Sequence, residues 1–486
     1  MRWQTYEHFD AETGFSSKAG FQLSAKQIEK VHYLLLNPKN LNKMEVGCGK
    51  TVVSTVVSLM LDYRITIITV PPILITGWVE WLEQVSSDVL KYRGTPNERA
   101  GMNIATARWV VCSHAIFRQD FARISTDVAK ACRTRAVSVD TRPKHERESE
   151  VIVDEAHALK NPKSVLYKKV VTITAGDVGL QMLTGTPISK PLDAYTYINL
   201  KSPGEYRSYA HFEAVHVAER DFFKNPTKYA NLDLLRENLD KASVSGTKEE
   251  MHGYKLKPLT PNCHYDLDPQ HMALYTKLVD EQLLSFEDGT IIDASSVQKL
   301  RQALQQVVVN WAHFANDPSK RAAIFDMIDL TMEEIEVTDK SKSKLIIWTT
   351  YKMSSKRIWD YCLAQGVKTV AAYGDSDSEK AVQLFMKDEA TRILVAQPQS
   401  CGAGLNPQYV CSEALFPEIS TVPIYNRQAW GRIDRVGQVR IPRMKLAVAR
   451  GTVQEGLYLD LLRNDDMVAY IEPTKKSIRQ MLLGQT

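Results

Sequence analysis

The chain has 486 residues, of which 44% are hydrophobic and 24% are charged, a balance typical of folded globular proteins and unlike that of disordered or collagen-like chains. This length is enough for roughly two or three domains and excludes a single small binding module. The 61 Lys and Arg residues against 57 Asp and Glu leave a formal net charge of only +4, so bulk charge alone does not indicate a nucleic-acid partner.

No membrane or secretory segment is evident in the sequence. The longest largely apolar stretch, Ile65–Ile75, contains two prolines and is shorter than the about 20 residues that a membrane span needs. The polar, acidic start of the chain lacks the basic and apolar regions of a secretory signal. We therefore expect a protein without membrane contact, located in the cytoplasm, or in the host cytoplasm if the source is viral. The scattered cysteines, without a C-x-x-C pair, predict reduced and mostly buried thiols.

Short apolar runs alternate with helical patterns in two parts of the chain, which is typical of a parallel sheet covered by helices. In the first part the runs are Ile65–Val70, Trp109–Cys112, Val151–Val153 and Gln181–Leu183. Toward the C-terminus they are Leu345–Trp348, Thr369–Ala372, Ile393–Ala396 and Lys445–Val448. This pattern predicts an α/β protein with two lobes.

The part of the chain between these lobes has a different pattern. A helical stripe is formed by Leu300, Leu304, Val307, Val308 and Trp311. The polar segment Val337–Lys344 that follows is typical of a linker. We therefore expect a first lobe at residues 1–195, a helical insertion and linker at 196–340, and a second lobe at 341–486.

A glycine-rich loop, GCGKT from Gly47 to Thr51, follows the short run Leu41–Val46 and precedes a helical pattern. In such a loop, backbone N–H groups and the helix N-terminus surround phosphates, with Lys50 on the outer phosphates and Thr51 on Mg²⁺. Met44 stands where the full phosphate-loop motif has its first glycine. Taken alone, the loop leaves open a simple glycine turn with a surface lysine.

The strand Val151–Val153 ends in two adjacent carboxylates, Asp154 and Glu155. Side chains at the carboxyl end of a parallel strand reach the ligand crevice. There Asp154 can hold Mg²⁺, and Glu155 can orient or deprotonate an attacking water. A strand that merely meets solvent is the alternative, but the phosphate loop upstream favours an ATP site.

These motifs resemble those of superfamily-two helicase motors, and specifically those of the SWI/SNF-like DNA translocases. The resemblance rests on segments in family order: Val70–Pro72 with Trp78, Asp154–Asn161, Leu183–Ile188, Gly402–Asn406, Gln428–Gln438 and Gly451–Glu455. It implies two RecA-like parallel-sheet lobes with a helical insertion between them, in a compact member of bacterial or phage type. Two departures concern Ser245 and Gly246, where the family has an arginine pair, and Ser189–Pro191, where asparagines are usual.

The resemblance also implies which residues serve ATP hydrolysis. The expected ATP-binding set is Gly47, Gly49, Lys50, Thr51, Asp154 and Gln27, with Thr51 and Asp154 on Mg²⁺. The expected catalytic set is Glu155, Gln428, Arg432 and Arg435. The two arginines, expected on one face of a helix, would neutralise charge on the transferring phosphoryl group; a basic face that pairs with solvent is the alternative. For Gln27, the alternative to reading adenine is a solvated side chain.

Contacts to nucleic acid are predicted for Pro71, Thr184, Gly402, Gly404, Asn406, Arg133 and Arg135. The two arginines belong to a basic stretch that would either contact phosphates or form a solvated loop. We expect a monomeric, DNA-dependent ATPase that translocates along duplex rather than single-stranded DNA and remodels DNA or protein–DNA complexes. Its protein partner is unknown from sequence. The alternatives are a strand-separating or branch-migrating helicase and, of another class, an ATP-gated clamp that binds DNA or protein without moving.

Overall fold

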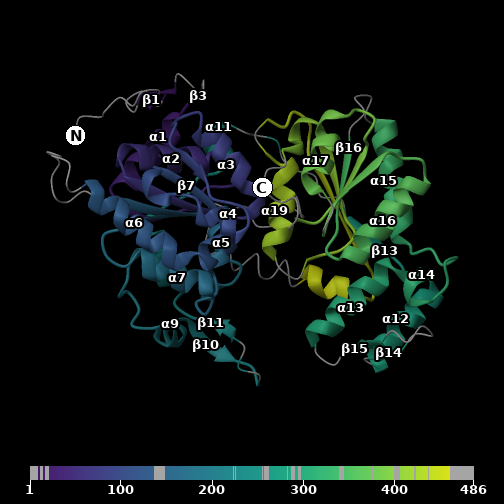
Figure 1. Ribbon diagram of the computed structural model, residues 1–486. Helices are drawn as coiled ribbons and strands as arrows, with labels where there is room; N and C mark the ends of the chain where they lie inside the picture. The colour runs from purple at the N-terminus through teal and green to yellow at the C-terminus, as the bar shows by residue number, and fades with distance from the viewer. Residues whose placement is uncertain are drawn as a thin grey trace. The chain divides into compact units, whose positions relative to one another are not determined.

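The structure, a computed structural model, describes residues 9–10, 15–16, 21–135, 148–222, 224, 226–253, 256, 262–281, 283–285, 291–293, 297–338, 344–374, 377–398, 406–420, 423–435 and 437–459. The chain divides into two compact units, formed mainly by residues 1–254 and 255–466. In each unit a twisted parallel sheet lies between layers of helices (Figure 1). This confirms the predicted α/β fold with two parallel-sheet lobes of the RecA-like type.

The first unit is built on a seven-stranded sheet whose described pairs are all parallel. In spatial order its strands are β12 (Ser243–Val244), β4 (Lys39–Asn42), β9 (Gly179–Leu183), β8 (Ser149–Asp154), β5 (Ile65–Val70), β7 (Trp109–Ser113) and β6 (Val89–Lys91). The central strands are covered on both faces, which is why they form continuous apolar runs in the sequence.

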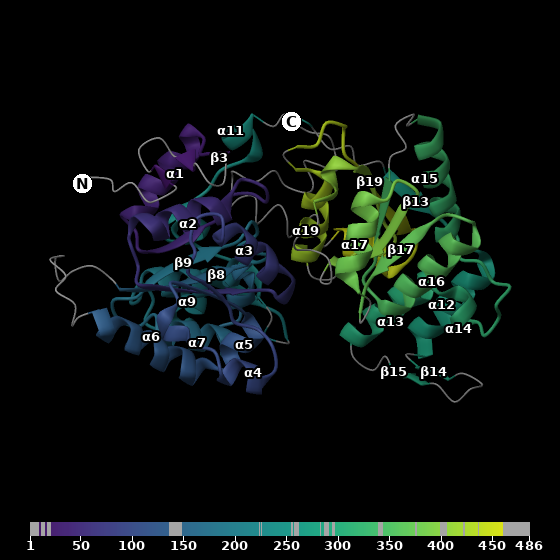
Figure 2. The ribbon, with the colours of Figure 1, turned by 45° about the horizontal axis from the view of Figure 1, so that its top comes forward.

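Two sets of helices cover the two faces of this sheet, as Figure 2 shows. One face carries α1 (Ala25–Leu35), α2 (Lys50–Met60) and α3 (Ile75–Leu82), which follows the short helix η1 (Pro72–Leu74). The other carries α5 (His114–Gln119), α6 (Phe121–Arg135), α7 (Val165–Ile173), α8 (Ala194–Lys201), α9 (Tyr209–His216) and α10 (Leu232–Asp240).

Shorter elements complete the first unit. Three are helical turns: η2 (Ile104–Thr106), η3 (Ala156–Leu159) and η4 (Pro191–Asp193). Two are short α-helices, α4 (Pro96–Ala100) and α11 (Lys248–His252). The antiparallel strands are β1 (Phe9–Asp10), β2 (Phe15–Ser16) and β3 (Phe21–Gln22) in one small sheet, and β10 (Val217–Arg220) and β11 (Pro226–Tyr229) in a hairpin.

The second unit contains a six-stranded sheet, again parallel in all its described pairs. Its spatial order is β13 (Asn262–Tyr265), β20 (Arg443–Ala449), β19 (Cys411–Phe416), β16 (Lys344–Trp348), β18 (Ile393–Ala396) and β17 (Thr369–Ala372). The smaller elements are the hairpin β14 (Leu283–Ser285) and β15 (Ile291–Asp293), and the turn η5 (Pro407–Tyr409).

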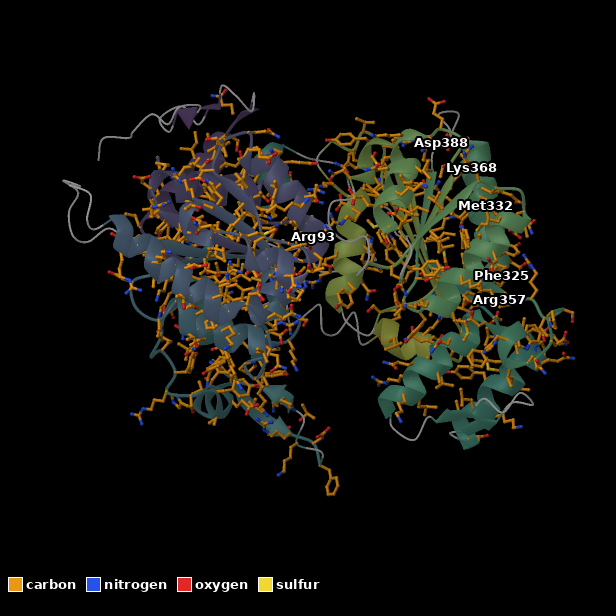
Figure 3. The ribbon with its side chains drawn as sticks, in the orientation of Figure 1. Arg93, Phe325, Met332, Arg357, Lys368 and Asp388 are labelled. Atoms are coloured by element: carbon orange, nitrogen blue, oxygen red, sulfur yellow. The ribbon has the colours of Figure 1, made fainter. Side chains whose placement is uncertain are left out.

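Two apolar clusters hold the helices of the second unit to this sheet. One contains α12 (Pro269–Glu281), α13 (Val297–Val309), α14 (Trp311–Phe314), α15 (Ile324–Thr338) and α16 (Lys352–Ala364); the other contains α17 (Ser378–Lys387) and α19 (Pro423–Ile433). Two residues of α15, Phe325 and Met332, pack in the first of these clusters (Figure 3). Nearby, an ion pair of 2.9 Å between Lys368 and Asp388 ties the chain before β17 to the chain after α17.

The eight apolar runs that predicted the two lobes fall within parallel strands, whereas only the first two residues of the run Leu41–Val46 do so, because β4 ends at Asn42. The predicted middle part also differs from the structure. Residues 196–340 do not form a unit of their own, because the division falls at 254/255. The strand β12 pairs with β4 in the first sheet, and β13 pairs with β20 in the second. The predicted linker is also displaced: its described residues belong to α15 and β16, inside the second unit.

The predicted helical stripe is interrupted. Helix α13 ends at Val309 and α14 begins at Trp311, with Asn310 between them at φ −113° and ψ 41°. The Asn310 amide Nδ2 donates to the carbonyl of Gln306 at 2.9 Å and to Oγ of Ser354 at 2.9 Å. The Gln306 carbonyl also accepts from the backbone N–H of Asn310 at 2.9 Å, so the side chain shares it with the last helical bond of α13. Local side-chain bonds of this kind compete with continuation of a helix.

Other sequence-based expectations can be compared with the described residues. Within them, no helix is long and apolar enough to span a membrane. Six of the cysteines lie in this part of the chain and are free thiols, five of them buried and Cys132 half-buried. The prediction of reduced, mostly buried cysteines is therefore confirmed for those six.

Candidate ATP-binding site

The predicted phosphate loop lies between β4 and α2 in the first unit. Gly47 and Gly49 have φ values of +90° and +82°, and a Cβ at Gly49 would come 2.5 Å from Nε2 of Gln27, so both conformation and space require glycine there. Lys50 begins α2, and its Nζ donates to the carbonyls of Met44 and the next residue at 3.0 Å each. The loop thus curls around the lysine while α2 presents its N-terminus, the geometry that binds phosphate.

Met44, which replaces the first glycine of the motif, is fully buried. It lies in the apolar cluster beneath α1 and α2, together with Val53, Val57 and Met251. The side chain therefore fills the core and leaves the loop intact.

Gln27 lies against the phosphate loop. It belongs to a capping box at the start of α1, in which its Oε1 accepts from the backbone N–H of Ser24 at 2.9 Å. Its Nε2 donates to the carbonyl of Cys48 at 3.1 Å, and the side chain is buried. The solvated alternative for Gln27 is therefore wrong, and its role at adenine stays a prediction.

Asp154 ends β8 with its carboxylate buried and one hydrogen bond to each of its oxygens. Oδ1 accepts from the backbone N–H of Glu155, and Oδ2 accepts from the indole Nε1 of Trp78, each at 2.8 Å. Burial, together with the charge of Glu155, raises the pKa of Asp154 to about 6, against opposing effects of the Trp78 hydrogen bond and of Lys50. A buried carboxylate with a hydroxyl such as that of Thr51 is an oxygen donor set that suits Mg²⁺ completed by substrate phosphates.

Glu155 has a left-handed backbone, with φ 49° and ψ 48°, just before η3. A residue other than glycine in this conformation stores strain of about 1–3 kcal/mol, and such residues cluster at functional sites. Its Oε2 lies 3.2 Å from Nδ1 of His157, and the Glu155 side chain is partly exposed. The carboxylate is thus accessible and oriented, as a residue that acts on water must be.

Sequence reasoning missed a second histidine at this edge, His114 at the start of α5. Its Nδ1 lies 2.9 Å from Oγ1 of Thr69 at the end of β5. Burial, reinforced by the nearby His157, holds the pKa of His114 well below its usual range, so the ring is neutral. A single histidine after an apolar run carries no motif, so no sequence signal pointed to it.

The turn after β9 lies beside the phosphate loop. A Cβ at Gly185 would come 2.9 Å from Cγ2 of Val46 and 3.5 Å from Nζ of Lys50. Thr184 is fully buried, and its Oγ1 accepts from the backbone N–H of Thr186 at 3.1 Å. The hydroxyl shapes the turn and is not exposed, so the nucleic-acid contact at Thr184 stays a prediction with no exposed side chain to support it.

The segment after this turn, which departs from the family pattern, is held by Asp193. The backbone N–H and hydroxyl of Ser189 donate to Asp193 Oδ2 at 2.8 and 2.7 Å, and the Lys190 backbone N–H donates to it at 3.2 Å. Lys160 lies 3.5 Å from the same carboxylate. Asp193 thus joins this segment to the chain that follows the acidic motif.

The remaining nucleic-acid candidates of the first unit are only partly described. Pro71 is half-buried between β5 and η1. Arg133 is exposed on α6, where its Nε donates to the carbonyl of Ala129 at 3.2 Å. Arg135 is the last residue of α6, and the rest of the basic stretch lies outside the described residues. Phosphate contact by these arginines stays a prediction.

In the second unit, one predicted feature of the arginine pair is wrong. Helix α19 ends at Ile433, so it contains the buried Arg432 but not Arg435. The amide Nε2 of Gln438 donates to the carbonyl of Ile433 at 3.2 Å and to that of Cys411 at 2.9 Å. This cap from outside the helix occupies its last carbonyl, so the chain turns before Arg435 instead of continuing the helix.

The other predicted residues of the second unit differ in exposure. Gln428 is buried on α19, whereas Asn406 is exposed at the start of η5. Gly402 and Gly404 lie outside the described residues.

The sequence matches one protein family and is similar to several helicases. Residues 26–314 match the family described as SNF2-related domain. "Uncharacterized ATP-dependent helicase YqhH" of Bacillus subtilis is 23% identical over 465 residues, which cover 89% of this chain and 75% of that protein. "DNA annealing helicase and endonuclease ZRANB3" of Mus musculus is 20% identical over 435 residues, which cover 86% of this chain but only 38% of that protein.

Two solved structures with a similar fold are the following. "Sulfolobus solfataricus SWI2/SNF2 ATPase core in complex with dsDNA" is 17% identical with a TM-score of 0.40, covering 95% of this chain and 96% of that one. "Crystal structure of Pyrococcus furiosus Hef helicase domain" is 14% identical with a TM-score of 0.48, covering 90% and 98%.

Proposed function

Because the chain belongs to the SNF2-related domain family, we propose that it is a DNA-stimulated ATPase that translocates along duplex DNA and remodels DNA or protein–DNA complexes. One observation carries the proposal: the phosphate loop, the buried Asp154 and the turn at Gly185 converge at the carboxyl edge of the first sheet. Lys50 lies close enough to Asp154 to lower its pKa, and Gly185 closely approaches the loop. Ligands of open parallel sheets bind at this edge.

The chain's own residues divide the work of hydrolysis. Lys50 and the N-terminus of α2 bind the outer phosphates, and Thr51 with Asp154 holds the cation. When bound, Mg²⁺ neutralises charge that develops on the phosphates. Glu155, aimed by its left-handed backbone, orients the water and accepts its proton.

Two residues of the second unit complete the proposed chemistry. Arg432 and Arg435 neutralise charge on the transferring phosphoryl group, a contribution of about 10³–10⁵ in rate for such arginines. This assignment rests on the family resemblance of the segment Gln428–Gln438.

Duplex DNA is the proposed track. Two observations support it: the resemblance of the acidic motif Asp154–Asn161 to that of DNA translocases, and a mouse relative named as a DNA annealing helicase. A motor that follows the phosphate backbone shows little sequence preference, and its affinity falls steeply with salt because counterions are released on binding.

The test compares ATPase stimulation by duplex DNA, single-stranded DNA and RNA of equal length at two salt concentrations. We expect duplex DNA to stimulate most, and displacement of a triplex-forming strand to require ATP hydrolysis. Stronger stimulation by single strands, together with unwinding of a forked duplex, would contradict the proposed translocase activity and support a helicase activity. Stimulated hydrolysis without displacement or unwinding would instead identify a clamp.

A further inference from the structure

Helix α3 makes a buried contact with the proposed cation site. Trp78 lies in the middle of this helix with only 3% of its surface exposed. Its Nε1 donates to Oδ2 of Asp154 at 2.8 Å, across 76 positions of sequence. The bond is directed at the carboxylate proposed to hold Mg²⁺.

A second tryptophan of the same helix reaches the phosphate-loop helix α2. The Nε1 of Trp81 donates to Oγ1 of Thr55 at 3.0 Å. That hydroxyl in turn donates to the backbone carbonyl of Thr51 at 2.8 Å. Since Trp78 and Trp81 are three residues apart, they lie on one face of α3 and hold both proposed cation-binding residues.

The other end of α3 joins the proline turn predicted to contact nucleic acid. The backbone N–H of Leu74 donates to the carbonyl of Pro71 at 2.9 Å, and η1 runs directly into α3. Pro71 and Pro72 have fixed φ angles, which stiffen this connection. Ile75 packs in the apolar cluster under α3 and ties the helix to the sheet. A displacement of the turn would therefore move α3 as a body.

We propose, on the basis of the function proposed above, that Trp78 and Trp81 are positioning residues that link the Pro71–Leu74 turn to the cation site. Trp78 fixes the Asp154 carboxylate, and Trp81 fixes Thr51 through Thr55. Groups that orient a metal-binding side chain commonly contribute 10- to 100-fold in metal affinity or activity.

Trp109 on β7 offers a matched control. It is fully buried in the same apolar cluster as Trp78, but its Nε1 has no hydrogen-bond partner among the described residues. Trp109→Phe therefore removes a similar ring volume and no hydrogen bond. Trp78→Phe removes the same volume together with the bond to Asp154.

The experiment measures Mn²⁺ binding by electron paramagnetic resonance, in the presence of a non-hydrolysable ATP analogue, for the full chain and for Trp78→Phe, Trp81→Phe and Trp109→Phe. Melting temperatures of all four proteins separate folding losses from site effects. We expect Trp78→Phe to weaken Mn²⁺ binding by about 10-fold or more, and Trp109→Phe to bind as the wild type does. In ATPase assays, Trp81→Phe should lower the stimulation by duplex DNA more than the basal rate.

Equal Mn²⁺ binding by Trp78→Phe and Trp109→Phe would overturn the role of Trp78, and unchanged DNA stimulation in Trp81→Phe would overturn that of Trp81. Wild-type protein that binds the Mn²⁺-nucleotide but is not stimulated by any nucleic acid would contradict the proposed function and the link from the turn. In that case the Mn²⁺ affinity of Trp78→Phe would still decide whether Trp78 contributes to cation binding. Wild-type protein that binds no Mn²⁺-nucleotide would overturn both proposals.

Discussion

Arg435 donates a hydrogen bond from Nη1 to Oδ1 of Asn406 over 2.6 Å. The sequence assigned these residues to different tasks, Arg435 to the phosphoryl group and Asn406 to nucleic acid. The structure joins them across 29 positions of sequence.

We predict that Arg435→Lys lowers ATP turnover far more than DNA affinity. Lysine keeps the positive charge but lacks the planar fork that contacts a transferring phosphoryl group, so turnover should fall by about 10³-fold or more. Turnover and DNA binding are measured on the same protein. Arg450→Lys is the matched control, because Arg450 is an exposed arginine paired with Asp266 at 2.8 Å. Similar losses in turnover and DNA affinity for Arg435→Lys would show a surface role instead.

Substitutions of Lys50 and Glu155 should affect nucleotide binding and ATP turnover differently. Lys50→Ala removes a charge that holds the phosphates, so nucleotide binding and turnover should both fall. Glu155→Gln keeps the shape but loses the carboxylate that acts on water, so ATP should still bind while turnover falls by about 10²-fold or more. Equilibrium binding of a fluorescent nucleotide and steady-state hydrolysis separate the two. A wild-type rate in Glu155→Gln would assign water activation to another residue.

Stability should depend on pH through Glu150 in β8. This buried carboxylate accepts from Oγ of Ser58 and, at 2.8 Å, from Nε2 of Gln181, so it joins β8 to α2 and β9. Burial raises the pKa of Glu150 to about 7. Between pH 4.5 and 7 the folded state therefore holds more protons than the unfolded state, and this contribution to stability is lost as the pH rises.

Glu150→Gln should accordingly flatten the pH dependence. Relative to the variant, the wild type should lose up to about 1.4 kcal/mol of unfolding free energy per pH unit in this window. Urea titrations at about pH 5 and about pH 8, on either side of the window, measure it. Glu219→Gln, at an exposed ion pair with Lys228 in the hairpin, should keep the wild-type dependence. A parallel pH dependence in wild type and Glu150→Gln would mean that Glu150 is ionised throughout.

The sequence was most informative where the signal is local. Strands such as Ile65–Val70 are buried on both faces, so each leaves a continuous apolar run that needs no partner to be recognised. The two-residue strand Ser243–Val244 leaves no such run, and its place is decided by pairing with β4 about two hundred residues earlier. That is why the predicted insertion extended across the real boundary between the units.

The candidate site shows the same limit. The loop from Gly47 to Thr51 and the carboxylates after β8 were predicted because each motif is contiguous. The bond from Trp78 to Asp154 and the contact of His114 with Thr69 arise from distant segments packing together, so no local spacing encodes them. The end of α19 was missed for a related reason, since a side chain from outside the helix, that of Gln438, occupies the last carbonyl.

The last prediction concerns the tightest point of the phosphate loop. Gly49→Ala should abolish tight nucleotide binding without unfolding the protein. The new methyl group would meet Nε2 of Gln27 at 2.5 Å, and the φ of +82° is strained for any side chain. The loop must therefore shift, which carries Lys50 with it.

A second substitution separates the two causes. Gln27→Ala in the Gly49→Ala background removes the clash but leaves the backbone strain. Because Gln27 is itself a predicted adenine contact, the double variant is compared with Gln27→Ala alone, and its nucleotide affinity should reach that of Gln27→Ala only in part. Gly77→Ala is the control, because Gly77 is exposed on α3 and a Cβ added there would have no neighbour within 4 Å. That change should leave nucleotide affinity unaltered and stabilise the helix by roughly 0.5–1 kcal/mol. An affinity in the double variant equal to that of Gln27→Ala alone would assign the whole effect to the clash with Gln27, and wild-type affinity in Gly49→Ala would contradict the assignment of this loop to phosphate.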